Sequence, residues 1–267
     1  MEKVTTRTLR EMKERKEKIA ALTCYDAATA RLLNEESVDV LLVGDSVANV
    51  KLGYENTLPV TLEEMLHHTR AAKRGNSRAL LVADVPFLTY EFDPADAVRS
   101  VGRLVKAGGA EAVKVEGSTP EILRSIRALV DANIPVVGHL GLTPQSVLRL
   151  GGYRVQGRGA GAARAILKGA RALEKAGVFL LVLEAVPAAV GRAVTRALRI
   201  PTLGIGAGPD CDGQILVVDD LLGLTPAPRP KFVRAYADLR AESARAVRAW
   251  RKDVKARRFP GPNETYL

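Results

Sequence analysis

The feature that most constrains this sequence is a series of short apolar runs separated by amphipathic stretches. The runs are Ile19–Cys24, Asp39–Val43, Ala79–Ala83, Ala112–Val115, Pro135–Gly138, Phe179–Leu183, Thr202–Ile205 and Ile215–Val218. They are nearly continuous in apolar residues and lack a polar alternation, which is typical of parallel strands buried on both faces. The sequence therefore predicts a parallel sheet whose two faces are both covered.

Helical patterns lie between most of these runs. They cover Ala27–Glu35, Leu62–Lys73, Pro94–Lys106, Pro120–Ala132, Ala160–Ala176 and Pro187–Leu198. Three of them begin with a proline, which is tolerated in the first turn of a helix. Eight strands alternating with helices in about 250 residues are typical of a (β/α)8 TIM barrel.

One connection does not fit the alternation, because residues 206–213 are too few for a crossover helix between the last two strands. A doubly wound open sheet is therefore the alternative architecture. We predict a single α/β TIM-barrel catalytic domain over residues 1–267. It would carry two helical additions, an N-terminal extension at residues 1–17 and a basic helix at residues 229–258.

The formal net charge of +10 raises the possibility of a nucleic-acid partner. However, the excess lies at the ends, with +3 in residues 1–20, +8 in residues 229–258 and zero in residues 21–228, and Glu264 in the last nine residues contributes −1. Only Tyr236 and Trp250 near the basic C-terminal stretch could stack on bases. We therefore expect no nucleic-acid partner, and the basic helix is interpreted as a solvated face or a subunit contact.

Other features narrow the class of protein. No apolar run approaches the roughly 20 residues that span a bilayer, so we expect no membrane association. The N-terminal residues are charged and lack the apolar core of a secretory signal. Cys24 and Cys211 are too few for a disulfide framework. We therefore expect a cytoplasmic protein.

Ionisable residues follow five successive strands, the second through the sixth. They are Asp45, Asp84, Glu116, His139 and Glu184. In a barrel, the carboxyl ends of the strands meet at one mouth, which is where catalysis occurs. Four carboxyl groups crowded together need a cation or shared protons to coexist. Oxygen ligands without a thiolate cluster favour Mg²⁺ or a similar divalent ion.

Lys114 lies two residues before Glu116, so both side chains would point to the same face of a strand. It is either a partner in a structural ion pair or a cation that neutralises an anionic substrate. His139 likewise has two interpretations, a core hydrogen-bonding role or a role in the site.

Several ordered motifs together resemble the ketopantoate hydroxymethyltransferase family. They are Thr23–Asp26, Val43–Ser46, Thr57–Leu62, Val113–Gly117, Gly138–Gln145, Leu150–Tyr153, Gly204–Gly208, Cys211–Gln214 and Asp219–Gly223. The similarity extends from about Ile19 to the Phe259–Pro260 region, which is most of the chain.

The resemblance implies a TIM-barrel enzyme that transfers a hydroxymethyl group from 5,10-methylenetetrahydrofolate to 3-methyl-2-oxobutanoate, giving ketopantoate for pantothenate synthesis. By position, Asp45 and Asp84 would bind Mg²⁺ and the substrate, and Glu116 would be the third metal-site carboxylate. Ser46 and Lys114 would contact the 2-oxo acid. Glu184 would be the general base in a metal-stabilised enolate mechanism, although Ala185 follows it where the family commonly has Cys. The family also implies a homo-oligomer, commonly a decamer.

Two other functions are compatible with parts of the sequence. A phosphoenolpyruvate mutase or isocitrate-lyase-like enzyme would share Asp45, Asp84 and Glu116, but no Lys-Lys-Cys-Gly-His loop is present. A non-catalytic module that binds RNA or acidic proteins would use the basic termini, and its binding would fall steeply with salt.

Overall fold

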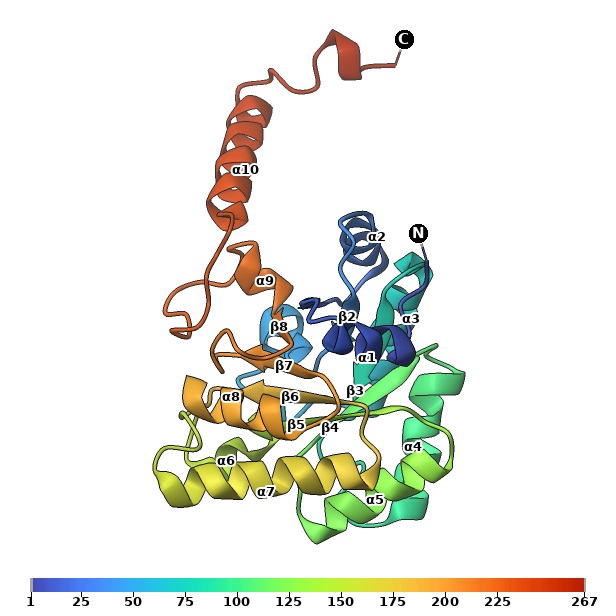
Figure 1. The fold of residues 1–267 in the computed structure, drawn as a ribbon. Coiled ribbons are helices and arrows are strands. Elements are labelled where there is room, and N and C mark those ends of the chain that lie inside the picture. Colours follow the sequence, from blue (N-terminus) through green and yellow to red (C-terminus); the bar gives the residue numbers. More distant parts are fainter. Residues whose placement is uncertain (1, 267) are drawn as a thin grey trace. The chain divides into compact units, whose positions relative to one another are not determined.

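The computed structural model describes residues 2–266, and eight parallel strands in them form a closed barrel in sequence order (Figure 1). The strands are β1 Ile19–Thr23, β2 Val40–Val43, β3 Leu80–Asp84, β4 Ala112–Glu116, β5 Val136–Gly141, β6 Leu180–Glu184, β7 Thr202–Ile205 and β8 Gly213–Leu216. Pairing of β1 with β8 closes the sheet, so the prediction of a TIM barrel is confirmed and the open sheet is excluded.

Helices connect most of the strands. They are α2 Ala27–Glu35, α3 Leu62–Gly75, α4 Pro94–Lys106, α5 Pro120–Asp131, α6 Val147–Leu150, α7 Ala160–Ala176 and α8 Ala188–Ala197. A π-helix, Ala48–Leu52, and a 3₁₀ turn, Pro144–Ser146, lie after β2 and β5. The side chains of Asp93 and Thr119 accept backbone N–H groups at the starts of α4 and α5, where proline occupies the first turn.

The short connection between β7 and β8 is a turn in place of a crossover helix. Gly206 and Gly208 adopt positive φ values of 66° and 84°, which glycine reaches without the steric penalty of a side chain. β8 begins at Gly213, two residues before the predicted start at Ile215, because the backbone of Gly213 pairs with Ile19 of β1. Glycine carries no apolar side chain, so the apolar pattern missed this part of the strand.

The N-terminal helix α1, Thr6–Glu14, closes the amino-terminal end of the barrel. Its buried Leu9 and Met12 pack against residues that include Ile19, Val40, Leu80, Val137 and Leu180. At the starts of the strands, Val4 N–H donates to Arg78 O, and Lys13 forms an ion pair with Asp212 at 2.8 Å. The predicted N-terminal extension therefore covers the amino-terminal end of the barrel with apolar side chains of α1, which we call the apolar floor.

The inward-facing residues change from apolar to ionisable along β3, β4, β5 and β6. On β3 the sequence is Leu80, Val82 and Asp84, and on β4 it is Ala112, Lys114 and Glu116. Alternate residues of a strand point to the same face. The apolar ones belong to the core cluster that contacts α1, so the charged ones lie at the opposite, carboxyl end. The barrel thus has one apolar end and one charged end.

The described residues divide into two compact units between Val217 and Val218. The second unit contains α9 Val218–Leu221, α10 Leu239–Lys255 and a 3₁₀ turn at Pro262–Glu264. The basic helix is shorter than the predicted 229–258, because the Asp238 side chain caps its start by accepting Ala241 N–H. A single catalytic domain over 1–267 stays a prediction. Among the described residues, no helix is long and apolar enough to cross a membrane.

Gly213→Ala tests the closure of the barrel. A Cβ at this position would overlap the carbonyl oxygen of Ile19 and approach Leu203 Cδ2 to 2.6 Å, both in neighbouring strands. Overpacking of this kind costs about 1–3 kcal/mol, so we expect a lower urea midpoint of unfolding. Gly102→Ala in α4 is the control, because a Cβ there meets open space. Equal midpoints for the two variants would contradict the tight contact between β1 and β8.

Candidate active site

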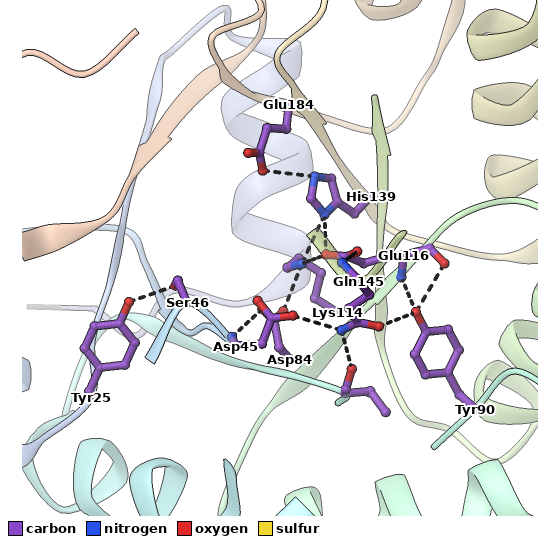
Figure 2. Close-up of polar contacts among 11 residues, drawn as sticks. Tyr25, Asp45, Ser46, Asp84, Tyr90, Lys114, Glu116, His139, Gln145 and Glu184 are labelled. Carbon is purple, nitrogen blue, oxygen red and sulfur yellow. Dashed lines mark hydrogen bonds and ion pairs between the residues drawn. The ribbon is translucent and has the colours of Figure 1, made fainter. Parts of the chain in front are cut away.

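Five side chains predicted from strand ends converge at the charged end of the barrel (Figure 2). Asp84, Glu116, His139 and Glu184 lie within β3, β4, β5 and β6 rather than beyond them, whereas Asp45 lies just after β2. The register pairs Asp84 with Lys114, and Glu116 with His139, on neighbouring strands. These four strands end later than predicted, because inward-facing charged residues can continue a strand when they find partners inside the barrel.

Lys114 is the centre of this group. Its side chain is only 5% exposed, and its Nζ lies 3.1 Å from Asp84 Oδ1 and 3.4 Å from Glu116 Oε1. Burial alone would lower the pKa of this ammonium, but Asp84, Glu116 and Asp45 raise it above the ordinary value for lysine. Lys114 is therefore a buried cation surrounded by carboxylates, which we call the carboxylate cluster: Asp45, Asp84 and Glu116.

The carboxylate cluster places three buried carboxyl groups around a single lysine. Burial, followed by repulsion from Asp84 and Glu116, raises the pKa of Asp45 to about 8. Burial also raises the pKa of Asp84. Glu116 differs, because Lys114 and His139 lower its pKa despite its burial. A further cation near Asp45 and Asp84 would therefore lower their pKa values and favour their ionised forms.

His139 links this cluster to Glu184. Its Nδ1 lies 3.0 Å from Glu116 Oε1, and its Nε2 lies 3.4 Å from Glu184 Oε2. Burial and Lys114 oppose protonation of the ring, but Glu116 and Glu184 raise its pKa to about 9. Glu184 itself does not contact Lys114, and its side chain is 16% exposed against 3% for Glu116. Glu184 is thus the carboxylate of this group that is most open to solvent.

Ser46 lies at the site because it directly follows Asp45 in the chain. Its Oγ lies 2.9 Å from the hydroxyl oxygen of the buried Tyr25, which comes from the end of β1. A Cβ at Gly44 would approach Ser46 Oγ to 2.7 Å, so glycine leaves room for this hydroxyl. The π-helix Ala48–Leu52 follows directly, and such helices frequently occur at functional sites.

Sequence reasoning assigned no role to Tyr90 and Gln145, which bracket the cluster. The Gln145 amide nitrogen donates to Asp45 Oδ2 at 3.0 Å, and its backbone N–H donates to Glu116 Oε2 at 3.0 Å. The Tyr90 hydroxyl lies 3.0 Å from Gln145 Oε1. Both residues come from loops beyond β3 and β5. The signal for Gln145 was its place in the Gly138–Gln145 motif, which does not specify a contact.

The residues present fit a magnesium ion that is completed by other ligands. Among residues 2–266, no three His, Cys, Asp or Glu side chains are arranged to hold a metal by themselves. Mg²⁺ is usually bound by one or two carboxylates and retains water or substrate ligands. Asp45 and Asp84 supply hard oxygen donors, and burial is the main cause of their raised pKa values, to which repulsion from neighbouring carboxylates adds. Both oxygens of Glu116 contact protein groups, and the oxygens of Asp84 lie against Lys114 Nζ and the backbone N–H of Asp45.

The fold and this site define a class of barrel proteins with acidic residues at the carboxyl ends of the strands. The chain resembles the solved structure of 2,3-dimethylmalate lyase, a PEP mutase/isocitrate lyase superfamily member, with a TM-score of 0.60 and 18% identity over 98% of this chain and 91% of that chain. It also resembles phosphonopyruvate hydrolase in complex with oxalate and Mg²⁺, with a TM-score of 0.62 and 14% identity over 98% and 93%. At these identities the likeness shows the fold alone.

Sequence relatives define the family more narrowly. The ketopantoate hydroxymethyltransferase profile matches residues 3–262. The 3-methyl-2-oxobutanoate hydroxymethyltransferase of Moorella thermoacetica is 51% identical over 99% of this chain and 98% of its own length. That of Geotalea daltonii is 50% identical over the full length of both. The chain belongs to the ketopantoate hydroxymethyltransferase family and is an enzyme of the hydroxymethyltransferase class, which confirms the resemblance seen in the motifs.

Lys114→Met tests the electrostatic balance of the cluster. Removing one partner of a buried ion pair costs about 3–5 kcal/mol, because the other charges are left without compensation. We expect a lower urea midpoint of unfolding at pH 7 in buffer containing EDTA. Lys106→Met, at the end of α4, is the surface control.

The deficit of Lys114→Met should also depend on pH. The pKa of Glu116 is lowered in the folded protein, so its contribution to stability is present above its unfolded pKa and is lost as the pH falls through its folded pKa. The difference between wild type and Lys114→Met should therefore narrow in acid. A deficit that stays constant as the pH falls well below the ordinary glutamate pKa of 4.5 would contradict the ion-pair origin of the effect.

Proposed function

We propose that this enzyme transfers a hydroxymethyl group from 5,10-methylenetetrahydrofolate to 3-methyl-2-oxobutanoate, giving ketopantoate for pantothenate synthesis, with Glu184 as the general base. The names of the relatives support the 2-oxo acid and the reaction class. The observation that carries the mechanism is the separation of Glu184 from the ion pair between Lys114 and Glu116. Among the residues drawn in Figure 2, Glu184 contacts only His139, and its side chain is 16% exposed.

The acidic residues would share two tasks. Asp45 and Asp84 would hold a divalent ion, and Glu116, whose oxygens contact Lys114, His139 and Gln145, would reach it through water. When bound, Mg²⁺ would supply a Lewis acid for the keto and carboxylate oxygens of the substrate. Lys114 would place a fixed positive charge near the same oxygens, where negative charge develops. Ser46, held by Tyr25, would donate a hydrogen bond to the 2-oxo acid.

Glu184 would take the proton from C3 of the substrate, and His139 would hold the carboxylate in position. One of the two C–N bonds of the methylene bridge would open first, and its nitrogen would take up a proton, which leaves an iminium carbon on the other nitrogen. The electron pair left at C3 would form the new bond to this carbon. Water would then supply the hydroxyl group as the second C–N bond breaks and that nitrogen takes up a proton. Before the substrate binds, the side chain of Glu184 is partly exposed to solvent.

The remaining expectations from sequence follow the same proposal. The partners would be a small 2-oxo acid and a folate, with neither nucleic acid nor membrane involved. The protein would be cytoplasmic and a homo-oligomer, with a decamer as the assembly that the family resemblance implies. Analytical ultracentrifugation would test the assembly, and a single species of 28.7 kDa would overturn it.

Glu184→Gln should abolish removal of the C3 proton while preserving binding of the 2-oxo acid. Loss of a general base typically costs about 10²–10⁴-fold in rate. The measurement is exchange of the C3 proton of 3-methyl-2-oxobutanoate in D₂O by NMR, without folate. Glu121→Gln, on the exposed first turn of α5, is the matched control and should exchange normally. Exchange at the wild-type rate in Glu184→Gln would exclude this residue as the base.

Asp45→Asn and Asp84→Asn should each weaken divalent-ion binding. Changing a group that merely supports a metal ligand costs about 10–100-fold in affinity, so changing a ligand itself should cost at least as much. The measurement is calorimetric titration with Mg²⁺ in the presence of the 2-oxo acid. Asp96→Asn, whose carboxylate pairs with Arg99 on the surface of α4, is the control. Unchanged affinity in both cluster variants would overturn the assignment of the metal ligands.

A further inference from the structure

Gln145 is joined to two members of the carboxylate cluster by different parts of the same residue. The side-chain amide nitrogen donates to Asp45 Oδ2 at 3.0 Å and to the carbonyl oxygen of Val85 at 2.9 Å. The backbone N–H donates to Glu116 Oε2 at 3.0 Å. Gln145 is buried in the 3₁₀ turn after β5, so it brings fixed donors from one loop to carboxylates from β2 and β4 (Figure 2).

The orientation of the Gln145 amide follows from its neighbours. One of the two groups that face its nitrogen, the backbone carbonyl of Val85, can only accept a hydrogen bond. A reversed amide would place its oxygen against this carbonyl and leave two buried acceptors without a donor between them, which is costly. The amide oxygen must therefore face Tyr90.

Tyr90 completes this arrangement with its single hydroxyl hydrogen. The Tyr90 oxygen accepts the backbone N–H of Glu116 at 2.9 Å. Its own hydrogen can go to Gln145 Oε1 at 3.0 Å or to the carbonyl oxygen of Glu116 at 3.2 Å, of which Gln145 is the nearer. The Tyr90 ring is buried, so water does not compete freely for these groups. A chain of hydrogen bonds thus extends from Glu116 through Tyr90 and Gln145 to Asp45.

We propose that Tyr90 and Gln145 are positioning residues that hold Asp45 in the orientation needed for divalent-ion binding, with Tyr90 acting through Gln145. The proposal rests on the assignment of Asp45 as a metal ligand made above. The amide anchors Asp45 Oδ2, and this fixes the direction of the other carboxylate oxygen. Groups that orient metal ligands without touching the metal affect its affinity strongly.

The test is a double-mutant cycle with Tyr90→Phe and Gln145→Met. Methionine keeps the length of the glutamine side chain and removes its donor and acceptor, while the backbone bond to Glu116 remains. Free Mn²⁺ is counted by electron paramagnetic resonance, with Mn²⁺ alone as the probe and no 2-oxo acid present. We expect Gln145→Met to weaken Mn²⁺ binding about 10-fold or more, and Tyr90→Phe to weaken it several-fold.

The decisive result is the effect of Tyr90→Phe in the Gln145→Met background. If Tyr90 acts through Gln145, the second substitution should change the Mn²⁺ affinity less than about twofold, since coupled residues are non-additive. Effects that multiply would mean that Tyr90 acts through the backbone of Glu116, and would overturn the proposal. Tyr54→Phe, which loses a hydroxyl bonded to Glu64 at 2.7 Å, is the matched control and should bind Mn²⁺ normally.

Asp45→Asn in the same titration separates this proposal from the proposed function. If Asp45→Asn and Gln145→Met both retain Mn²⁺ binding, the metal site itself is misassigned. If only Gln145→Met retains it, the positioning role is wrong and the metal site stands. Thermal unfolding of each variant shows whether it folds. If Gln145→Met does not fold, Gln145→Leu, which also removes the side-chain donor and acceptor and keeps the backbone N–H, takes its place in the cycle.

Discussion

A buried ammonium among three carboxylates is the interaction on which the functional end of this barrel depends. Without Lys114, Asp84 would lose its nearest cation, and Glu116 would retain only His139. With it, Lys114 and His139 together lower the pKa of Glu116 despite its burial, whereas burial and repulsion raise the pKa of Asp45 to about 8. The lysine and the histidine therefore distinguish Glu116 from Asp45, although both are buried carboxyl groups.

The barrel supplies this arrangement through two properties of parallel strands. Alternate residues share a face, so one strand can contribute apolar residues near α1 and charged residues at the mouth. The register then places Lys114 beside Asp84, and His139 beside Glu116. The apolar floor formed with α1 stabilises the closed barrel, and the charged layer can sit above it because its groups are paired. Stability and chemistry are thus placed at opposite ends of the same strands.

How much of this the sequence predicted depends on how local each feature is. The strands, the helices between them and the carboxylates at the mouth follow from apolar periodicity and from the ends of the runs. Apolar periodicity does not predict the extra length of β5 through His139 to Gly141, or the early start of β8 at Gly213. At these places polar or glycine residues interrupt the apolar pattern while the backbone pairing continues. The contacts of Tyr90 and Gln145 span 55 residues between loops, so their partners depend on the assembled barrel.

The same dependence separates the role of Glu184 from that of Glu116. Both are glutamates at the inward-facing ends of strands, and sequence alone gives them equivalent positions. In the folded protein Glu116 contacts Lys114, His139 and the Gln145 backbone, which leaves it little freedom to accept a proton. Glu184 contacts Nε2 of His139 and no member of the carboxylate cluster, and its side chain is more exposed to solvent than that of Glu116. Two carboxylates of one type can thus take different tasks because their surroundings differ, and here the surroundings are set by which strand carries the lysine.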